Sequence, residues 1–134
     1  MKKRWFGDAR IDSKWEKKLA ETLFRSATFK PDKIDYKITK TYTPDFLVKA
    51  GVRDIYVEAK GRFRDRDEAR KYIFIRDELD KQDKHFVFLF YDPLKPMPFA
   101  KKRKDGTKQT HAEWAEKNNF EYYTETDFPR EWLE

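Results

Sequence analysis

The sequence contains no cysteine. A disulfide scaffold and a cysteine zinc site are therefore excluded, and a reducing, cytoplasmic environment is expected. Histidine is scarce: the two residues, His85 and His111, stand apart in the sequence, so no histidine metal site is expected. No apolar run approaches the roughly 18 residues of a membrane span, which excludes an integral membrane protein. The basic first residues lack the apolar region of a signal peptide, so we expect none.

Aromatic residues and charge are abundant. The 134 residues suffice for one compact domain. Aromatic residues make up 17% of the chain, which indicates a packed core. The net charge is +6 and is unevenly distributed. Residues 1–30 carry nine basic and four acidic side chains, residues 95–108 carry six basic and one acidic, and residues 109–134 carry two basic and seven acidic. Two basic blocks suit a polyanion such as nucleic acid, and a solubilising surface with a flexible lysine-rich loop is the alternative.

The hydrophobic pattern predicts elements in the order α-β-β-β-α-β-α, which is typical of an α/β fold with a mixed sheet flanked by helices. The capping-box spacing of Ser13 and Glu16 predicts a helix that reaches about Arg25. Alternating apolar residues at 34–38 predict a strand. The other expected elements are a hairpin of strands 45–48 and 52–60, a helix at 67–80, a central strand at 85–91 and a helix at 110–118.

Residues 41–61 contain the most informative chemistry. On a strand, Glu58 and Lys60 share one face and Ala59 points away. The hairpin can bring Asp45 alongside Glu58, and two adjacent carboxylates repel unless they are protonated or bridged by a cation. Mg²⁺ or Mn²⁺ is the natural occupant of such a site. The alternatives are a salt pair on a solvated strand for Glu58 and Lys60, and a role in strand entry for Asp45.

These residues resemble a known signature. Pro44 and Asp45, a gap of twelve residues and then Glu58-Ala59-Lys60 are similar to the PD-(D/E)xK motif of restriction-endonuclease-like nucleases. The wider context resembles phage endonuclease I, the resolvase of four-way (Holliday) junctions. The resemblance runs in order from about residue 10 to residue 133, through segments 13–16, 41–46, 57–61, 74–76, 85–88, 110–123 and 129–132.

The resemblance implies a restriction-endonuclease-like fold in an intertwined, domain-swapped homodimer. It implies metal ligation by Asp45, Glu58 and the backbone carbonyl of Ala59, with Lys60 as the catalytic lysine. A further carboxylate falls on Glu16, which would serve the partner's active site; a structural role as a capping-box glutamate is the alternative. The expected cofactor is Mg²⁺, replaceable by Mn²⁺, with two ions in each site.

We further expect a basic arm at residues 1–11 and a single nuclease domain at residues 12–134. The expected partners are branched DNA and a second copy of the chain, with no membrane and no small-molecule cofactor. His111 is a candidate phosphate contact, and Arg76 is expected to pair with a buried acid or to reach the DNA. The candidate DNA-binding residues are all basic: Lys2, Lys3, Arg4, Arg10, Arg62, Arg64, Lys101, Lys102, Arg103 and Lys104.

The function implied by the resemblance is a structure-selective endonuclease that resolves four-way junctions by paired nicks, leaving 5′-phosphate and 3′-hydroxyl ends. The implied location is the cytoplasm of an infected or prophage-carrying host cell. Two alternatives stay open. One is another PD-(D/E)xK nuclease, for transposon-end cleavage or repair nicking, and the other is a non-catalytic DNA-binding module.

Overall fold

The computed structural model describes residues 9–134, and the chain divides into two compact units, Met1–Lys40 and Thr41–Glu134. Three of the predicted DNA-binding residues, Lys2, Lys3 and Arg4, lie outside the described residues. Within residues 9–134, no helix combines the length and the apolar character that crossing a membrane requires. The predicted division into residues 1–11 and 12–134 stays a prediction.

Over residues 9–40, the first unit contains one helix, α1 (Ala9–Glu21), with Arg10 in its first turn. Because α1 begins at Ala9, Ser13 lies inside the helix, and the predicted start at a Ser13 capping box is wrong. The helix also ends earlier than residue 25. The Thr22 hydroxyl donates a 2.7 Å hydrogen bond to the Lys18 carbonyl, which also accepts from the Thr22 N–H at 3.0 Å.

The strand predicted at residues 34–38 is wrong. Residues 31–44 have no regular secondary structure. The apolar alternation is present, but Ile34, Tyr36 and Ile38 are 85%, 80% and 69% exposed. A strand needs a neighbour to pair with its backbone N–H and C=O groups. Within residues 9–134 no strand pairs with this segment, so the pattern alone could not produce one.

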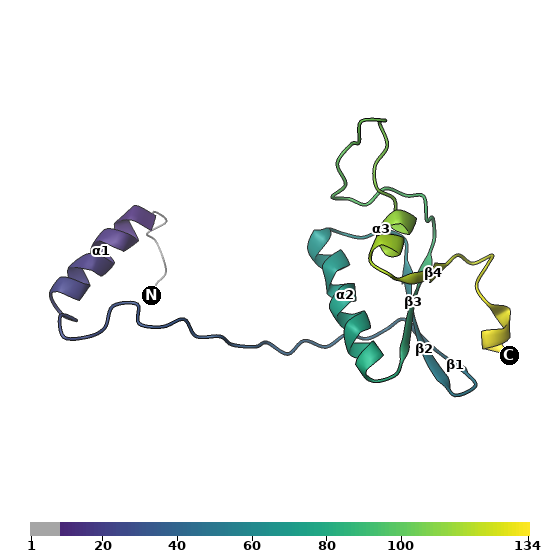
Figure 1. Ribbon diagram of the computed structural model, residues 1–134, viewed down its shortest axis with the longest axis horizontal. Coiled ribbons are helices and arrows are strands. Elements are labelled where there is room, and N and C mark those ends of the chain that lie inside the picture. The colour runs from purple at the N-terminus through teal and green to yellow at the C-terminus, as the bar shows by residue number, and fades with distance from the viewer. Residues whose placement is uncertain (1–8) are drawn as a thin grey trace. The chain divides into compact units, whose positions relative to one another are not determined.

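The second unit is built on one mixed sheet in the order β1-β2-β3-β4 (Figure 1). β1 and β2 form an antiparallel hairpin, and Gly51 at its turn has φ +65, a conformation that glycine adopts without strain. β2 pairs with β3, and β3 with β4, in parallel. The elements in chain order are β1 (Phe46–Ala50), β2 (Arg53–Lys60), α2 (Arg66–Lys81), β3 (His85–Phe90), α3 (His111–Lys117), β4 (Glu121–Tyr123) and the 3₁₀ helix η1 (Arg130–Leu133).

Both faces of the sheet are covered. Figure 1 shows α2 and α3 on one side of the sheet and η1 on the other. The predicted central strand at 85–91 is thus confirmed, since β3 has a strand on each side and a core on each face. The first core contains Tyr72, Phe86, Phe88, Phe90, Trp114 and Phe120. The second contains Ile55, Val57 and Val87, packed against Tyr123, Phe128 and Trp132.

The capping box predicted at residues 110–113 is confirmed. The Thr110 side chain accepts a hydrogen bond from the Glu113 backbone N–H at 3.1 Å, and the Glu113 carboxylate accepts one from the Thr110 N–H at 2.9 Å. The C-terminal end of α3 is bound by Arg76 of α2, which donates to the Asn118 carbonyl at 2.7 Å. Its guanidinium also lies 4.5 Å from the Phe120 ring centroid. Arg76 therefore joins two helices. Its carboxylate partner, Asp77 at 3.0 Å, is exposed, so the expected buried acid is wrong, and a DNA contact by Arg76 stays a prediction.

His111 is fully buried, so the predicted phosphate contact is wrong. Its ring lies 5.1 Å from the Phe63 ring and 5.3 Å from the Phe90 ring, and Nδ1 is 2.6 Å from the Lys95 carbonyl oxygen. Nδ1 must therefore carry the proton that it donates, which leaves Nε2 buried with no hydrogen-bond partner among residues 9–134. Burial lowers the pKa of His111, although the hydrogen bond to Lys95 opposes the shift.

Acidification is expected to destabilise the fold through His111. Below its ordinary pKa of about 6.5 the unfolded chain binds a proton that the folded chain resists, so the free energy of unfolding decreases as the pH falls, by at most about 1.4 kcal/mol per pH unit. Urea unfolding between about pH 7.5 and about pH 5.5 measures this slope, and His111→Phe should have a shallower one. Identical slopes in the two proteins would contradict the role of His111 in this pH dependence.

Candidate active site

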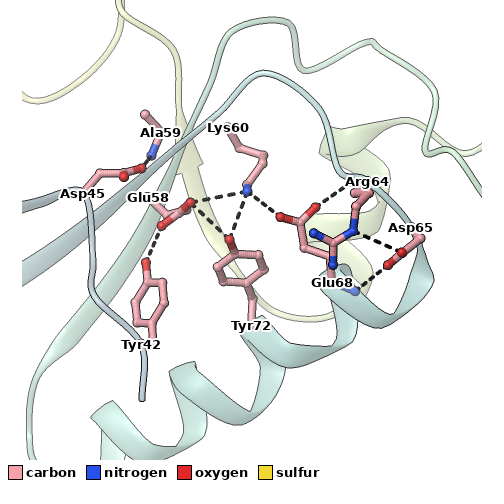
Figure 2. Close-up of polar contacts among 9 residues, drawn as sticks. All are labelled: Tyr42, Asp45, Glu58, Ala59, Lys60, Arg64, Asp65, Glu68 and Tyr72. Atoms are coloured by element: carbon pink, nitrogen blue, oxygen red, sulfur yellow. Dashed lines mark hydrogen bonds and ion pairs between the residues drawn. The ribbon is translucent and has the colours of Figure 1, made fainter. Parts of the chain in front are cut away.

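The hairpin brings Asp45, Glu58 and Lys60 together. The register pairs Phe46 with Val57, so Asp45, one residue earlier, lies beside the end of β2. Its Oδ2 accepts a 2.9 Å hydrogen bond from the Ala59 backbone N–H. Glu58 and Lys60 point to the opposite face from Ala59, toward α2, as the alternation of a strand requires (Figure 2).

Glu58 is buried, with 7% of its surface exposed. Its Oε1 accepts a short hydrogen bond from the Tyr42 hydroxyl, and its Oε2 accepts one from the Tyr72 hydroxyl at 3.1 Å. The Lys60 ammonium lies 3.3 Å from the same Oε2. A salt pair on a solvated strand is therefore excluded, because α2 and its side chains cover this face of β2.

The Lys60 ammonium has two further oxygen partners on α2. It donates to the Tyr72 hydroxyl at 2.9 Å and to Glu68 Oε2 at 3.1 Å (Figure 2). Burial disfavours the ammonium, but the hydrogen bonds to Tyr72 and Glu68 outweigh it and raise the pKa of Lys60 above its ordinary value. Lys60 is therefore protonated at neutral pH, and is a cation and hydrogen-bond donor rather than a base.

Three side chains around Glu58 and Lys60 also have shifted pKa values. Burial raises the pKa of Tyr72 to about 12, against the opposing effect of the hydrogen bond from Lys60. Burial and the hydrogen bond to Glu58 raise the pKa of Tyr42 as well. For Glu68, hydrogen bonds from the Arg64 N–H and from Lys60 outweigh burial and lower the pKa. Both tyrosines thus stay neutral donors and Glu68 stays ionised.

Sequence reasoning missed Tyr42, Tyr72 and Glu68. Asp65 and Glu68 have the spacing of a helix start, and the structure has Asp65 as the N-cap that accepts from the Glu68 N–H at 2.9 Å. This signal places Glu68 in the first turn of a helix directly after β2. Tyr72 lies within the helix predicted at 67–80, but the sequence pattern does not show what its hydroxyl contacts.

The donor set fits a hard divalent cation. Asp45 and Glu58 supply carboxylate oxygens from adjacent strand positions, and Mg²⁺ is commonly bound by one or two carboxylates, with waters and phosphate oxygens completing its shell. Within residues 9–134, no group of three or more histidine, aspartate or glutamate side chains is arranged around one point. A metal site in this part of the second unit would therefore rest on the two carboxylates of Asp45 and Glu58. Ligation by the Ala59 carbonyl stays a prediction.

Glu16 lies in α1, in the first unit, and is half-exposed. Its carboxylate is 3.6 Å from the Lys30 ammonium. The alternative role as the third residue of a capping box is wrong, because α1 begins seven residues before Glu16. A role in an active site stays a prediction.

Two predicted DNA-binding residues, Arg62 and Arg64, follow β2 directly and are exposed. Together with Lys95 and Glu68 they line a hollow of about 480 Å³. The Arg64 guanidinium lies 3.2 Å from the Asp65 carboxylate, and the Arg64 side chain is 75% exposed. This hollow is therefore basic and directly adjacent to the partners of Lys60.

The lysine-rich block lies in the loop between β3 and α3, where Lys101, Lys102 and Lys104 are exposed. Arg103 differs from them, because its guanidinium is 3.2 Å from Glu113 of α3 and its Nη1 donates to Thr107. The block is thus anchored to α3 through its arginine. DNA contacts by these residues stay predictions.

A search of curated proteins finds no match to this chain. The family model described as Phage endonuclease I matches residues 9–134, nearly the whole chain. The match includes α1, the hairpin with Asp45, Glu58 and Lys60, and both helices of the second unit. The chain therefore belongs to the phage endonuclease I family.

Proposed function

We propose that this protein is a divalent-metal-dependent DNA endonuclease that resolves four-way junctions by paired nicks. The observation that carries the proposal is the buried Glu58–Lys60 pair beside Asp45, in a chain of an endonuclease family. Burying a carboxylate and an ammonium costs free energy that a well-packed apolar pair would not. Such a cost, at the end of a strand and beside a second carboxylate, favours a catalytic role.

In this proposal Asp45, Glu58 and the Ala59 carbonyl bind Mg²⁺, or Mn²⁺ in its place, and Glu16 joins them at a second ion. The metal would lower the pKa of a bound water and neutralise charge on the scissile phosphate. Lys60 donates hydrogen bonds, so it can orient a water or stabilise a phosphate oxygen without giving up its proton. Cleavage leaves 5′-phosphate and 3′-hydroxyl ends.

The proposed active form is an intertwined homodimer. Residues 34–38 keep the apolar alternation of a strand, with exposed Ile34, Tyr36 and Ile38, and no strand within residues 9–134 pairs with them. An extended segment of this kind is suited to pairing with another chain. A two-fold dimer would present two equal active sites, as two matched nicks require, and the partner subunit would then supply its own Glu16.

DNA binding in this proposal uses the basic hollow beside Lys60 and the exposed lysines of the loop before α3. Phosphate contacts position a duplex without reading its sequence, which agrees with recognition of branched shape rather than of base order. The proposed place of action is the cytoplasm of the infected or prophage-carrying host cell.

The test compares an immobile four-way junction with a linear duplex of the same sequence, each with Mg²⁺. We expect paired, symmetric nicks in the junction at protein concentrations that leave the duplex intact. Equal cleavage of both substrates would contradict junction selectivity while keeping the nuclease. No cleavage of either, with Mn²⁺ also present, would contradict the enzyme and favour a DNA-binding module.

A further inference from the structure

Within residues 9–134, Lys60 has three oxygen partners, as many as an ammonium has protons. They are the Tyr72 hydroxyl at 2.9 Å, Glu68 Oε2 at 3.1 Å and Glu58 Oε2 at 3.3 Å. The first two belong to α2, and the third and longest belongs to β2, the strand of Lys60 itself. The ammonium is thus shared between the two elements.

In the proposed function the Glu58 contact cannot persist unchanged. A divalent cation on Glu58 would draw electron density from the carboxylate that Lys60 contacts and would repel the ammonium. If Glu58 were the main anchor of Lys60, metal binding would displace the lysine. The site therefore requires partners for Lys60 other than Glu58.

We propose that Glu68 and Tyr72 are positioning residues that keep the Lys60 ammonium in place when Glu58 binds a divalent cation. This inference rests on the proposed function, because it assigns the two residues to the same reaction. With Glu68 and Tyr72 retained, one proton of Lys60 becomes available to a phosphate oxygen or a water. The negative charge of Glu68 also continues to balance the positive charge of Lys60 once Glu58 binds the cation.

Both anchors are themselves fixed by their surroundings. Glu68 Oε1 accepts a 2.6 Å hydrogen bond from the Arg64 N–H, and the N–H of Glu68 is bound by the N-cap Asp65. Tyr72 is 2% exposed, and its ring packs 5.3 Å from that of Phe88. Anchors of this kind orient a catalytic group without touching the substrate.

Two variants separate the anchors. Tyr72→Phe keeps the packed ring and removes the hydroxyl that accepts from Lys60 and donates to Glu58, whereas Glu68 contacts Lys60 without touching Glu58. In Glu68→Gln the amide oxygen still accepts from the Arg64 N–H, which turns the amide NH₂ toward the ammonium in place of an acceptor. Matched controls are Asp67→Asn, a charge change in the same helical turn, and Tyr122→Phe, which removes a hydroxyl that binds Glu116.

Each protein is tested by single-turnover cleavage at saturating junction DNA and by DNA affinity with Ca²⁺ in place of Mg²⁺. We expect Tyr72→Phe and Glu68→Gln to lower the cleavage rate by about 10- to 100-fold, the usual effect of losing an orienting partner, with DNA affinity unchanged. The two controls should match the wild type. Equal losses in the controls, or losses in affinity instead of rate, would overturn the proposal.

An independent readout does not require activity. In ¹⁵N-labelled protein without DNA, the Lys60 ammonium protons are protected from exchange with water by their hydrogen bonds, and we expect this protection to persist when Mg²⁺ is added. It should be lost on Mg²⁺ addition in Tyr72→Phe and Glu68→Gln. Persistence in both variants would overturn the proposal. A wild-type protein with protected Lys60 protons but no cleavage would instead overturn the proposed function alone.

Discussion

Replacing Lys60 with methionine is expected to lower the rate of DNA cleavage by about 10²–10³-fold, the loss measured when one preorganised donor to a developing negative charge is removed. Methionine keeps the unbranched apolar stem of lysine, so the packing along the stem is preserved. What is lost is the ammonium that lies between Glu58 and Glu68. Single-turnover cleavage of a four-way junction measures the effect.

The same change is expected to lower stability. The side chains of Lys60, Glu58 and Glu68 are only 10%, 9% and 13% exposed, so removing the cation leaves two buried carboxylates near each other. Breaking a buried ion pair in this way costs about 3–5 kcal/mol. Urea unfolding measures the free energy, and the cleavage assay is run at a temperature where circular dichroism shows the variant folded.

The matched control is Lys49→Met on β1. Lys49 also has a carboxylate at 3.0 Å, that of Asp54, but its side chain is 70% exposed. Exposed pairs contribute about 0–1 kcal/mol, so this variant should keep its stability and its activity. Wild-type cleavage by a folded Lys60→Met protein would contradict the role of Lys60.

The hairpin and the residues on it could be predicted from the sequence because their arrangement is local. Glu58 and Lys60 are two residues apart on one strand, and a hairpin fixes which residue of β1 lies beside them. The central strand 85–91 and the helix at 67–80 could be predicted for the same reason, because a continuous apolar run or a period of 3.6 residues is visible within a short window.

Contacts that depend on how distant elements pack could not be predicted. Glu68 and Tyr72 reach Lys60 because α2 crosses back over the sheet, and nothing in the spacing of these residues shows that crossing. His111 was misjudged for the same reason. Its position at the start of a helix beside a lysine block indicated solvent, whereas the fold encloses it between Phe63 and Phe90.

The strand expected at residues 34–38 failed for a different reason. Alternation describes which side chains a strand would bury, but the strand forms only where another chain segment supplies hydrogen bonds. The segment around Ile34, Tyr36 and Ile38 has the pattern without such a neighbour within residues 9–134. The alternation alone therefore does not determine whether a strand forms.

The central claim is that Asp45 and Glu58 bind the metal that cleavage requires, and Asp45→Asn is its sharpest probe. Asparagine has the shape of aspartate, and its side-chain oxygen can still accept from the Ala59 N–H, so the fold should be unchanged. What disappears is the negative charge and one oxygen ligand. A folded variant without activity would therefore point to the metal rather than to the structure.

The measurement is nicking of a four-way junction by the wild type and by Asp45→Asn, each with Mg²⁺ and with EDTA, alongside calorimetric titration of Mn²⁺. The wild type should nick only with Mg²⁺ and should bind Mn²⁺. Asp45→Asn should lose more than about 10²-fold in rate, beyond the range of changes outside the ligand shell, and should bind Mn²⁺ weakly. Nicking by the wild type in EDTA, or wild-type nicking and Mn²⁺ binding by Asp45→Asn, would contradict the claim.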